Sequence, residues 1–320
     1  MRSSIKTLLA VAVTAMAAAA NAAWPEKPVK LVVPYAAGGA ADALARVVAT
    51  ELGTRLKQQV IIENKAGAGG TIGAASVAQA APDGYTFLYD ATSFAVNPSL
   101  FPKLAFSYER DFVPVGMVAR IPTLLVVPAS SPVNTVADLL QRARSQSGGL
   151  TYASAGNGGA AHMSAELFAQ GHRIKLLHVP YKGGAPALTD LAGGQVDMMF
   201  SAVTASGPLV KSGRLKAIAT AFDQRIDAMP QLPTVAESGL PGFSAFEWNG
   251  IWAPAATPAD IVKRMETELV AVLALPTVRQ RLAEMGALPA QGDARELGAF
   301  VRSETAKWAG VVKAANIKLD

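Results

Sequence analysis

Two short glycine-rich segments carry the clearest chemical signal in the sequence. Residues 38–42 read GGAAD and residues 158–162 read GGAAH, an offset of 120 residues. Each segment follows an expected strand and begins an expected helix. A helix N-terminus carries unpaired backbone N–H groups and roughly half a positive charge, and glycines there allow a positive φ and close approach to a ligand. Each segment therefore predicts an anion site, and two facing sites would hold one small anion between them.

The side chains beside these glycines leave several interpretations open. Asp42 and His162 take matching positions in the first helical turn. For Asp42, an N-terminal helix anchor is favoured over a ligand contact. His162 is placed either to donate to a carboxylate or to close its own loop. Tyr35 and Ser154 precede the glycines, where a hydroxyl can reach the same anion. The competing interpretation is that the glycines only form tight strand–helix turns.

A third glycine cluster, at 67–73, resembles a dinucleotide-binding fingerprint. It reads G-x-G-x-x-x-G and departs from G-x-G-x-x-G in its spacing. It also follows the second expected strand rather than the first. We interpret it as a helix start, with no nucleotide bound.

Catalytic chemistry has weaker support than anion binding. Residues 152–156 read YASAG, which resembles a nucleophile elbow around Ser154 but lacks the first glycine of G-x-S-x-G. The only acid between Ser154 and His178 is Glu166, no histidine lies beyond His178, and we expect no triad. The chain has no cysteine and 3 histidines, which argues against a thiol nucleophile and a transition-metal site. We expect no enzyme activity, metal or cofactor.

The rest of the chain alternates short apolar stretches with amphipathic ones, as α/β folds do. A first set has strands at 29–33, 60–63 and 85–89 and helices at 41–56 and 71–81. After a break at 97–114, a second set has strands at 124–127, 150–153, 176–179, 196–200 and 215–219 and helices at 136–145, 160–170 and 185–192. Helices at 258–275, 276–285 and 293–315 are expected to return to the first set. This order predicts two α/β lobes with parallel, doubly wound sheets and one glycine segment in each. The chain is expected to cross between the lobes near 121–123 and 246–248.

The N-terminus predicts export. Arg2 and Lys6 precede an apolar run at 8–20, and Ala20-Asn21-Ala22 fits the A-x-A cleavage pattern of a secretory signal peptide. The run is too short for a membrane span, which needs about 20 residues. Removing 1–22 leaves 27 basic residues (29 minus 2) against 24 acidic ones, so the net charge falls from +5 to +3. The sequence contains no run of five like charges, so its charge pattern does not indicate nucleic-acid binding.

Several long segments resemble the Bug family, the extracytoplasmic solute receptors of tripartite tricarboxylate transporters. The resemblance covers about residues 24–320. The segments that carry it are WPEKPVKLVVPYAAGGAAD, VIIENKAGAGGTIGAASVAQAAPDGYTFL, TYASAGNGGAAHMSAELF, VPYKGGAPALTDLAGGQVDMMF and LPTVAESGLPGFSAFEWNGIWAPAATP. The resemblance implies a periplasmic binding protein fold of the second type, with two mainly parallel, doubly wound lobes and the ligand in the cleft between them. It also implies a receptor that closes on a small carboxylate and delivers it to a membrane permease.

Carried onto this chain, the family pattern places ligand contacts in both glycine loops, in the loop before Asn97-Pro98, and at the strand end 200–202. The expected ligand-binding residues are Tyr35, Ala36, Gly38, Gly39, Ala40, Ala41, Asp42, Thr92, Ser93, Ser154, Gly156, Asn157, Gly158, Gly159, His162 and Ser201. The chain departs from the family at 35–37, where members often have phenylalanine and proline, and at 91–94, where they often have Gly-Thr-His or Gly-His. The second departure places Phe94 in the expected pocket, where it would favour an aromatic or apolar ligand body.

These observations together predict a monomeric periplasmic receptor. Its expected parts are a signal peptide at 1–22, a first lobe at 23–122 plus 247–320, and a second lobe at 123–246. Two alternatives remain open from sequence, an exported serine hydrolase that uses Ser154 and a ligand sensor for a membrane signalling protein.

Overall fold

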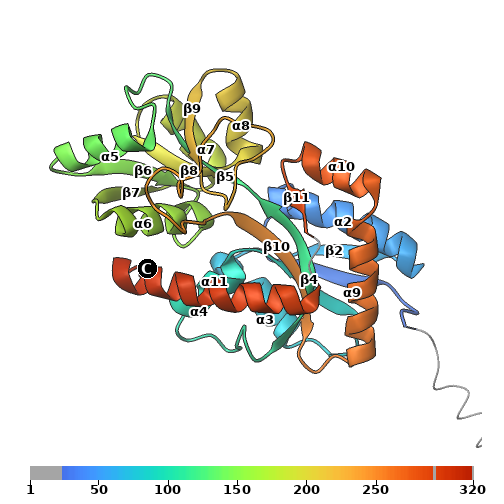
Figure 1. Cartoon of the computed structure of the whole chain (residues 1–320). Helices are drawn as coiled ribbons and strands as arrows, with labels where there is room; N and C mark the ends of the chain where they lie inside the picture. The colour runs from blue at the N-terminus through green and yellow to red at the C-terminus, as the bar shows by residue number, and fades with distance from the viewer. Residues whose placement is uncertain (1–23, 291–292, 319–320) are drawn as a thin grey trace, which may run out of the picture.

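The protein is built on two β-sheets, each covered by helices (Figure 1). The computed structural model describes residues 24–290 and 293–318, so the predicted signal peptide lies outside the described residues. Within those ranges no helix has both the length and the apolar character needed to span a membrane.

The larger sheet has six strands in the order β11-β4-β10-β3-β1-β2. Their bounds are β1 Val29–Val33, β2 Val60–Asn64, β3 Thr86–Asp90, β4 Phe112–Ile121, β10 Glu247–Pro254 and β11 Leu288–Pro289. β1, β2 and β3 are parallel, whereas β10 runs antiparallel to both β3 and β4. The smaller sheet has five strands in the order β7-β6-β8-β5-β9, with bounds β5 Thr123–Pro128, β6 Leu150–Ser154, β7 Leu176–Pro180, β8 Met198–Ala202 and β9 Leu215–Thr220.

The two-lobed α/β prediction is confirmed, although both sheets are mixed rather than mainly parallel. In the smaller sheet, β6 is parallel to β7 and β8, and β5 is antiparallel to β8 and β9. The antiparallel strands include those that connect the sheets, because β4 ends at Ile121 and β5 begins at Thr123. A strand that enters a sheet from the other lobe must run against the strands that end at that edge.

Helices cover both faces of each sheet. Their bounds are α2 Ala40–Leu56, α3 Thr71–Ala78, α4 Ser93–Leu100, α5 Val136–Ser145, α6 Ala160–His172, α7 Gly184–Ala192, α8 Val203–Lys211, α9 Ala259–Leu273, α10 Pro276–Glu284 and α11 Ala294–Ala315, with a 3₁₀ turn η2 at Ala68–Gly70. On the larger sheet, α2 and α9 share one apolar core, whereas α3, α4 and α11 bury side chains in the other. α11 also reaches α6 of the smaller lobe, where Gln170 Nε2 donates to the Val311 carbonyl at 3.1 Å (Figure 1).

The segment predicted as a break, 97–114, contains structure that the sequence pattern hid. α4 continues to Leu100 although Pro98 lies inside it, and proline normally ends a helix because it lacks an N–H donor. α8 contains Pro208 and was missed for the same reason. β4 begins at Phe112 and contains Pro114, a residue that argues against a central strand.

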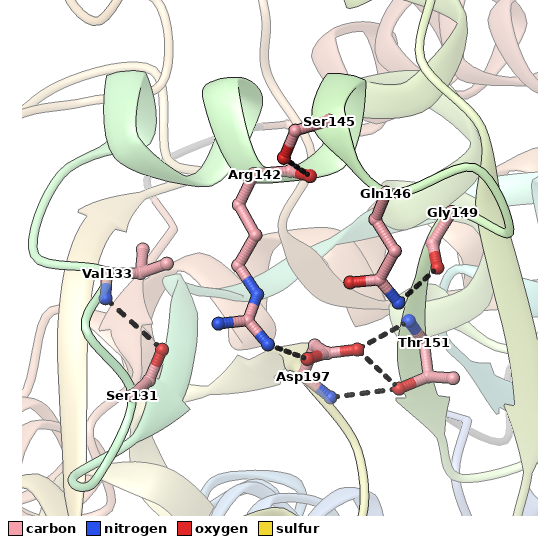
Figure 2. Close-up of polar contacts among 8 residues, drawn as sticks. All are labelled: Ser131, Val133, Arg142, Ser145, Gln146, Gly149, Thr151 and Asp197. Carbon is pink, nitrogen blue, oxygen red and sulfur yellow. Dashed lines mark hydrogen bonds and ion pairs between the residues drawn. The ribbon is translucent and has the colours of Figure 1, made fainter.

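A polar network ties together the amino ends of β6 and β8 (Figure 2). The Asp197 carboxylate accepts hydrogen bonds from the Thr151 backbone N–H at 2.9 Å and from the Thr151 hydroxyl at 2.8 Å. Arg142 of α5 contacts the same carboxylate at 3.3 Å, and Gln146 Nε2 donates to the Gly149 carbonyl at 3.0 Å. This network fixes the end of β6 opposite to the one that carries the second glycine segment.

Candidate functional site

The strand pairing brings the two glycine segments to the junction between the lobes. β1 and β3 are parallel, so they end at the same edge of the larger sheet. Ile121 at the end of β4 pairs with Glu247 at the start of β10, so both chain connections between the lobes leave from this edge. In the smaller sheet, Thr123 pairs with Ala202 at the end of β8, which is parallel to β6. Both carboxyl edges therefore lie at the crossing, the usual place for a ligand in open α/β sheets.

The two glycine segments adopt the same backbone shape. We call residues 34–39 loop 1 and residues 154–159 loop 2. Gly38 has φ +80° and Gly158 has φ +73°, values that favour glycine. The next residues are helix N-caps with extended backbone, Gly39 with φ −76° and ψ 169° and Gly159 with φ −73° and ψ 166°. Only the first glycine of each pair requires a positive φ.

The helices that follow these loops begin without a side-chain cap. Among the described residues, no side chain accepts a hydrogen bond from the first-turn amides at the N-caps of α2 and α6. Thr135 caps α5 through a capping box and Asp293 caps α11, whereas the other described α-helices also begin without a side-chain cap, so the glycine loop before each helix is what distinguishes α2 and α6. A helix leaves its first amides unsatisfied unless a cap, water or ligand accepts from them. The exposed starts of α2 and α6 therefore present donors suited to a carboxylate.

A carboxylate closes loop 1 from beneath. The Gly38 N–H donates to Asp42 Oδ2 at 2.9 Å, Arg46 Nε donates to the same oxygen at 2.9 Å, and Asn64 Nδ2 donates to Oδ1 at 2.9 Å. The hydrogen bond from Arg46 and those from Gly38 and Asn64 lower the pKa of Asp42 to about 2, against the effect of its burial. Asp42 is 2% exposed. Its carboxylate stabilises its own loop, in keeping with the predicted role of Asp42 as a helix anchor.

A neutral imidazole closes loop 2 in the same way. The Gly158 N–H donates to His162 Nδ1 at 3.0 Å, so of the two roles left open for His162, the structure contains the loop closure. The His162 ring stacks on His178 at 3.9 Å, and His178 stacks on Tyr152 at 4.8 Å. Burial lowers the pKa of both His162 and His178 to about 4, and the neighbouring His178 adds to the effect on His162. Both rings are uncharged at neutral pH.

His178 also forms a contact that the sequence analysis did not expect. Its Nε2 lies 2.6 Å from the Ser154 hydroxyl, which donates to or accepts from the ring. The parallel register of β6 and β7, which pairs Tyr152 with His178, brings the two residues together. No described carboxylate completes a triad, because Glu166 accepts from the Tyr152 hydroxyl at 2.6 Å. Ser154 is 0% exposed, and a histidine with its pKa lowered to about 4 is a weak base at neutral pH.

A second polar cluster lies at the carboxyl end of β3 and was also missed. Asp90 Oδ1 accepts from the Tyr35 hydroxyl, the Ser93 hydroxyl and the Ala91 N–H, each at 2.7 Å. Burial raises the pKa of Asp90 to about 6 although these three donors oppose the shift. Burial and the adjacent Asp90 carboxylate raise the pKa of Tyr35 well above its ordinary value. An acidic residue directly after an apolar strand was the available sequence signal.

The remaining predicted site residues fall into distinct environments. Ser201, at the end of β8, and Thr92, the N-cap of α4, are both 5% exposed. The prediction that Phe94 lies in the ligand pocket is wrong, because its ring stacks on Trp252 at 4.1 Å and meets Tyr108 edge-on at 4.8 Å. It lines a separate hollow of about 850 Å³ between α4, α11 and the 101–114 segment. Helical periodicity turns Phe94 away from Ser93 and toward the aromatic core.

Helix α4 links the two loops. Ser93 at its start contacts Tyr35 of the loop 1 segment, and Leu100 at its end lies against Gly158 of loop 2. A Cβ added to Gly158 would come within 2.3 Å of Leu100 Cδ1. At 1.5 Å rise per residue, seven steps along α4 span about 10 Å. Helix α4 thus runs across the junction from the loop 1 side to loop 2.

A family model described as "Tripartite tricarboxylate transporter family receptor" matches residues 44–317. The chain belongs to this receptor family. The receptor is 34% identical to protein BugT of Bordetella pertussis over 298 residues, 92% of this chain and 91% of that protein. It is 37% identical to R. palustris Rpa4515, solved with adipate, with a TM-score of 0.82 over 92% of this chain and 99% of that one. It is 35% identical to MatC of Rhodopseudomonas palustris, solved with malate, with a TM-score of 0.78 over 90% of this chain and 100% of that one.

These similarities confirm the Bug-family resemblance and the periplasmic binding protein fold with two lobes. The receptors of this family are periplasmic solute-binding proteins rather than enzymes. In the part of the chain that the structure describes, no group of three histidine or acidic side chains is arranged to hold a metal ion.

Proposed function

We propose that this receptor captures a small organic carboxylate between its lobes, with the amides at the starts of α2 and α6 as the main anchors. The observation that carries the proposal is the repeated loop, which places an uncapped helix start on each side of the junction. Relatives with adipate and malate bound support the ligand class. The proposed contacts are Tyr35, Ala36, Gly38, Gly39, Ala40, Ala41, Asp42, Thr92, Ser93, Ser154, Gly156, Asn157, Gly158, Gly159, His162 and Ser201. Asp42 and His162 act in this proposal by holding the loops in shape.

The lobes in this proposal comprise residues 23–122 plus 247–320 and residues 123–246. They close around the ligand as a monomer and deliver it to a membrane permease. A signal peptide at 1–22 brings the chain to the periplasm. The ends of β4 and β10, which pair at Ile121 and Glu247, are the natural place for the hinge.

The hydrolase alternative has no support from the family, and the geometry of Ser154 argues against it. Its hydroxyl is fully buried and donates to the Gly156 carbonyl at 3.0 Å as well as contacting His178. A nucleophile must instead be exposed to its substrate. The sensor alternative has no specific observation in its favour.

The proposal is tested by giving the helices a cap of their own. Gly159 has an N-cap backbone that suits aspartate, and its nearest neighbour to an added Cβ lies at 3.6 Å. In a Gly159→Asp variant the carboxylate accepts from the first-turn amides, which stabilises the helix by a few tenths of a kcal/mol relative to glycine. The same carboxylate occupies the ligand position and repels the ligand. We expect the protein to melt at the same or a higher temperature while affinity falls at least about a hundredfold.

The measurement is isothermal titration of the wild type and variants with adipate, malate and a broad carboxylate panel. Gly159→Ala is the matched control, because it adds the Cβ but no acceptor and should keep most of the affinity. Gly39→Asp repeats the test in loop 1, where an added Cβ lies 3.4 Å from the Ala36 carbonyl. Unchanged affinity in both aspartate variants contradicts the amide anchors, and a wild type that binds no carboxylate contradicts the proposed function.

A further inference from the structure

The wall of the site beside loop 1 carries a carboxylate that the loop architecture does not use. Asp90 is 0% exposed, and its Oδ2 atom is buried without a hydrogen-bond partner among the described residues. Its other oxygen accepts from two hydroxyls and one amide. No described basic side chain forms an ion pair with it, whereas Asp42 beneath loop 1 pairs with Arg46. A buried carboxylate without a cation is costly and therefore needs an explanation.

Asp90 determines which groups the neighbouring hydroxyls can offer to a ligand. A tyrosine or serine hydroxyl has one hydrogen to donate and lone pairs to accept with. The Tyr35 and Ser93 hydroxyls are hydrogen-bonded to each other and to Asp90 Oδ1, so both of their hydrogens are used within this cluster. Both residues are partly exposed, and a ligand group that reaches either oxygen meets an acceptor rather than a donor. This wall accepts hydrogen bonds and carries negative charge behind its acceptors.

The opposite wall has the reverse character. Loop 2 is closed by the neutral His162, and His178 behind it is also uncharged. The amides at the start of α6 are donors without a side-chain cap. The junction therefore has donors on its loop 2 side and acceptors, at Tyr35, Ser93 and Asp90, on its loop 1 side.

From this polarity, and building on the proposed function, we infer that the ligand is a carboxylate that also carries a hydrogen-bond donor, a hydroxyl or an ammonium group. Its carboxylate lies against the amides of loop 2, and its donor lies against the oxygens of Tyr35 and Ser93. Asp90 is a positioning residue, because it holds both hydroxyls as acceptors and supplies the negative charge behind them. An unsubstituted dicarboxylate would place a second anion against this wall and bind more weakly.

Matched acids test this inference by isothermal titration. The three sets are propionate, lactate and alanine; succinate, malate and aspartate; and glutarate, 2-hydroxyglutarate and glutamate. In the set whose length fits, we expect a donor-bearing acid to bind at least about tenfold more tightly than its parent, the effect of one well-placed hydrogen bond. In Tyr35→Phe, and independently in Ser93→Ala, this ratio should fall to about threefold or less.

The controls separate the possible outcomes. Tyr85→Phe removes a hydroxyl that accepts from the Glu26 N–H at the amino end of β3, far from the loops, and should leave the ratio unchanged. Asp90→Asn keeps the shape but removes the charge. A larger loss for the amino acid than for the hydroxy acid identifies an ammonium, and equal losses identify a hydroxyl. Parent acids that bind as tightly as their substituted partners in every set, or a ratio that survives Tyr35→Phe, overturn the inference alone. Failure of all nine acids to bind counts instead against the proposed function.

Discussion

Loop 1 and loop 2 share one backbone shape but have opposite chemistry beneath it. The φ values of Gly38 and Gly158, +80° and +73°, lie within 7° of each other. In each loop the N–H of the first glycine donates to a side chain four residues later. That side chain is an ionised carboxylate in loop 1 and a neutral imidazole in loop 2.

The difference extends one helical turn further. In α2, Arg46 pairs with Asp42. The equivalent residue in α6 is Glu166, whose carboxylate accepts a hydrogen bond from the Tyr152 hydroxyl. Loop 1 is therefore held by an ion pair and loop 2 by stacked aromatic rings. Backbone geometry thus presents the amides, whereas the side chains below set the local electrostatic potential independently on each side.

The largest expected effect is an opposite pH dependence of stability in the two lobes. The pKa of Asp90 is raised from 3.8 to about 6, so between about pH 4 and 6 the folded state holds a proton that the unfolded chain releases. Stability from this group falls as pH rises through that window, by about 3 kcal/mol for two pH units. The pKa values of His162 and His178 are lowered from 6.5 to about 4 in the folded protein. As pH drops from about 6.5 to 4, the unfolded chain therefore binds protons at these histidines before the folded protein does, and stability falls.

Urea unfolding of the wild type, Asp90→Asn and His178→Phe at pH 4 and pH 7 separates these effects. Relative to wild type, Asp90→Asn should gain about 3 kcal/mol between pH 4 and pH 7. His178→Phe keeps an aromatic ring in the stack and should lose less stability on acidification, by about 2 kcal/mol once its partial exposure is allowed for. Parallel pH curves for all three proteins would contradict the assigned environments.

A smaller effect should distinguish the first glycines of the two loops. An added Cβ at Gly38 meets nothing within 4 Å, whereas at Gly158 it comes 2.3 Å from Leu100 Cδ1 across the junction. Both Gly38→Ala and Gly158→Ala bear the strain of a positive φ, about 1–2 kcal/mol. Only Gly158→Ala also displaces the Leu100 side chain across the junction, so we expect its affinity to be about tenfold weaker than that of Gly38→Ala in titrations with the best ligand of the panel.

Leu100→Ala provides the matched rescue. Combined with Gly158→Ala, it removes the clash and leaves the strain, so the double variant should bind like Gly38→Ala. If the double variant binds no better than Gly158→Ala, the contact between α4 and loop 2 does not limit closure.

The smallest expected effect comes from giving loop 2 the carboxylate acceptor that loop 1 has. His162→Asp keeps an acceptor for the Gly158 N–H but places an uncompensated charge beneath loop 2. A like charge near the bound carboxylate should weaken affinity roughly fivefold, an effect that high salt reduces. Adding Glu166→Arg recreates the Asp42–Arg46 pair and should restore most of the affinity. An affinity that is independent of the charge at residue 162 would show that a carboxylate and an imidazole are interchangeable as acceptors beneath the loop.

Much of this architecture was predictable because it depends on local rules. The helix at 136–145 begins and ends as predicted, since Thr135 and Asp138 form a capping box and its apolar face repeats with helical periodicity. The glycine pairs were predictable because a strand–glycine–helix sequence has few alternatives. The positive φ at Gly38 and Gly158 follows the same logic, although sequence could not tell which glycine of each pair needs it.

What sequence could not supply depends on pairing between distant residues. His178 reaches Ser154 only through the register of β6 with β7. Asp90 becomes a buried acceptor only because Tyr35, 55 residues away, folds over it. β10 lies between β3 and β4 as an antiparallel strand, a placement set by the return of the chain from the other lobe. Phe94 was misjudged because its direction depends on where α4 begins.

The uncapped starts of α2 and α6 also bear on how such a receptor changes over generations. A main-chain amide is encoded by no particular codon, so a point mutation cannot delete it, except by introducing proline. The surrounding residues, such as Tyr35, Ser93 and His162, can be replaced one at a time while these amides persist. With the amides as the proposed anchors, single substitutions can therefore change which ligand is bound over generations without removing the donors for its carboxylate.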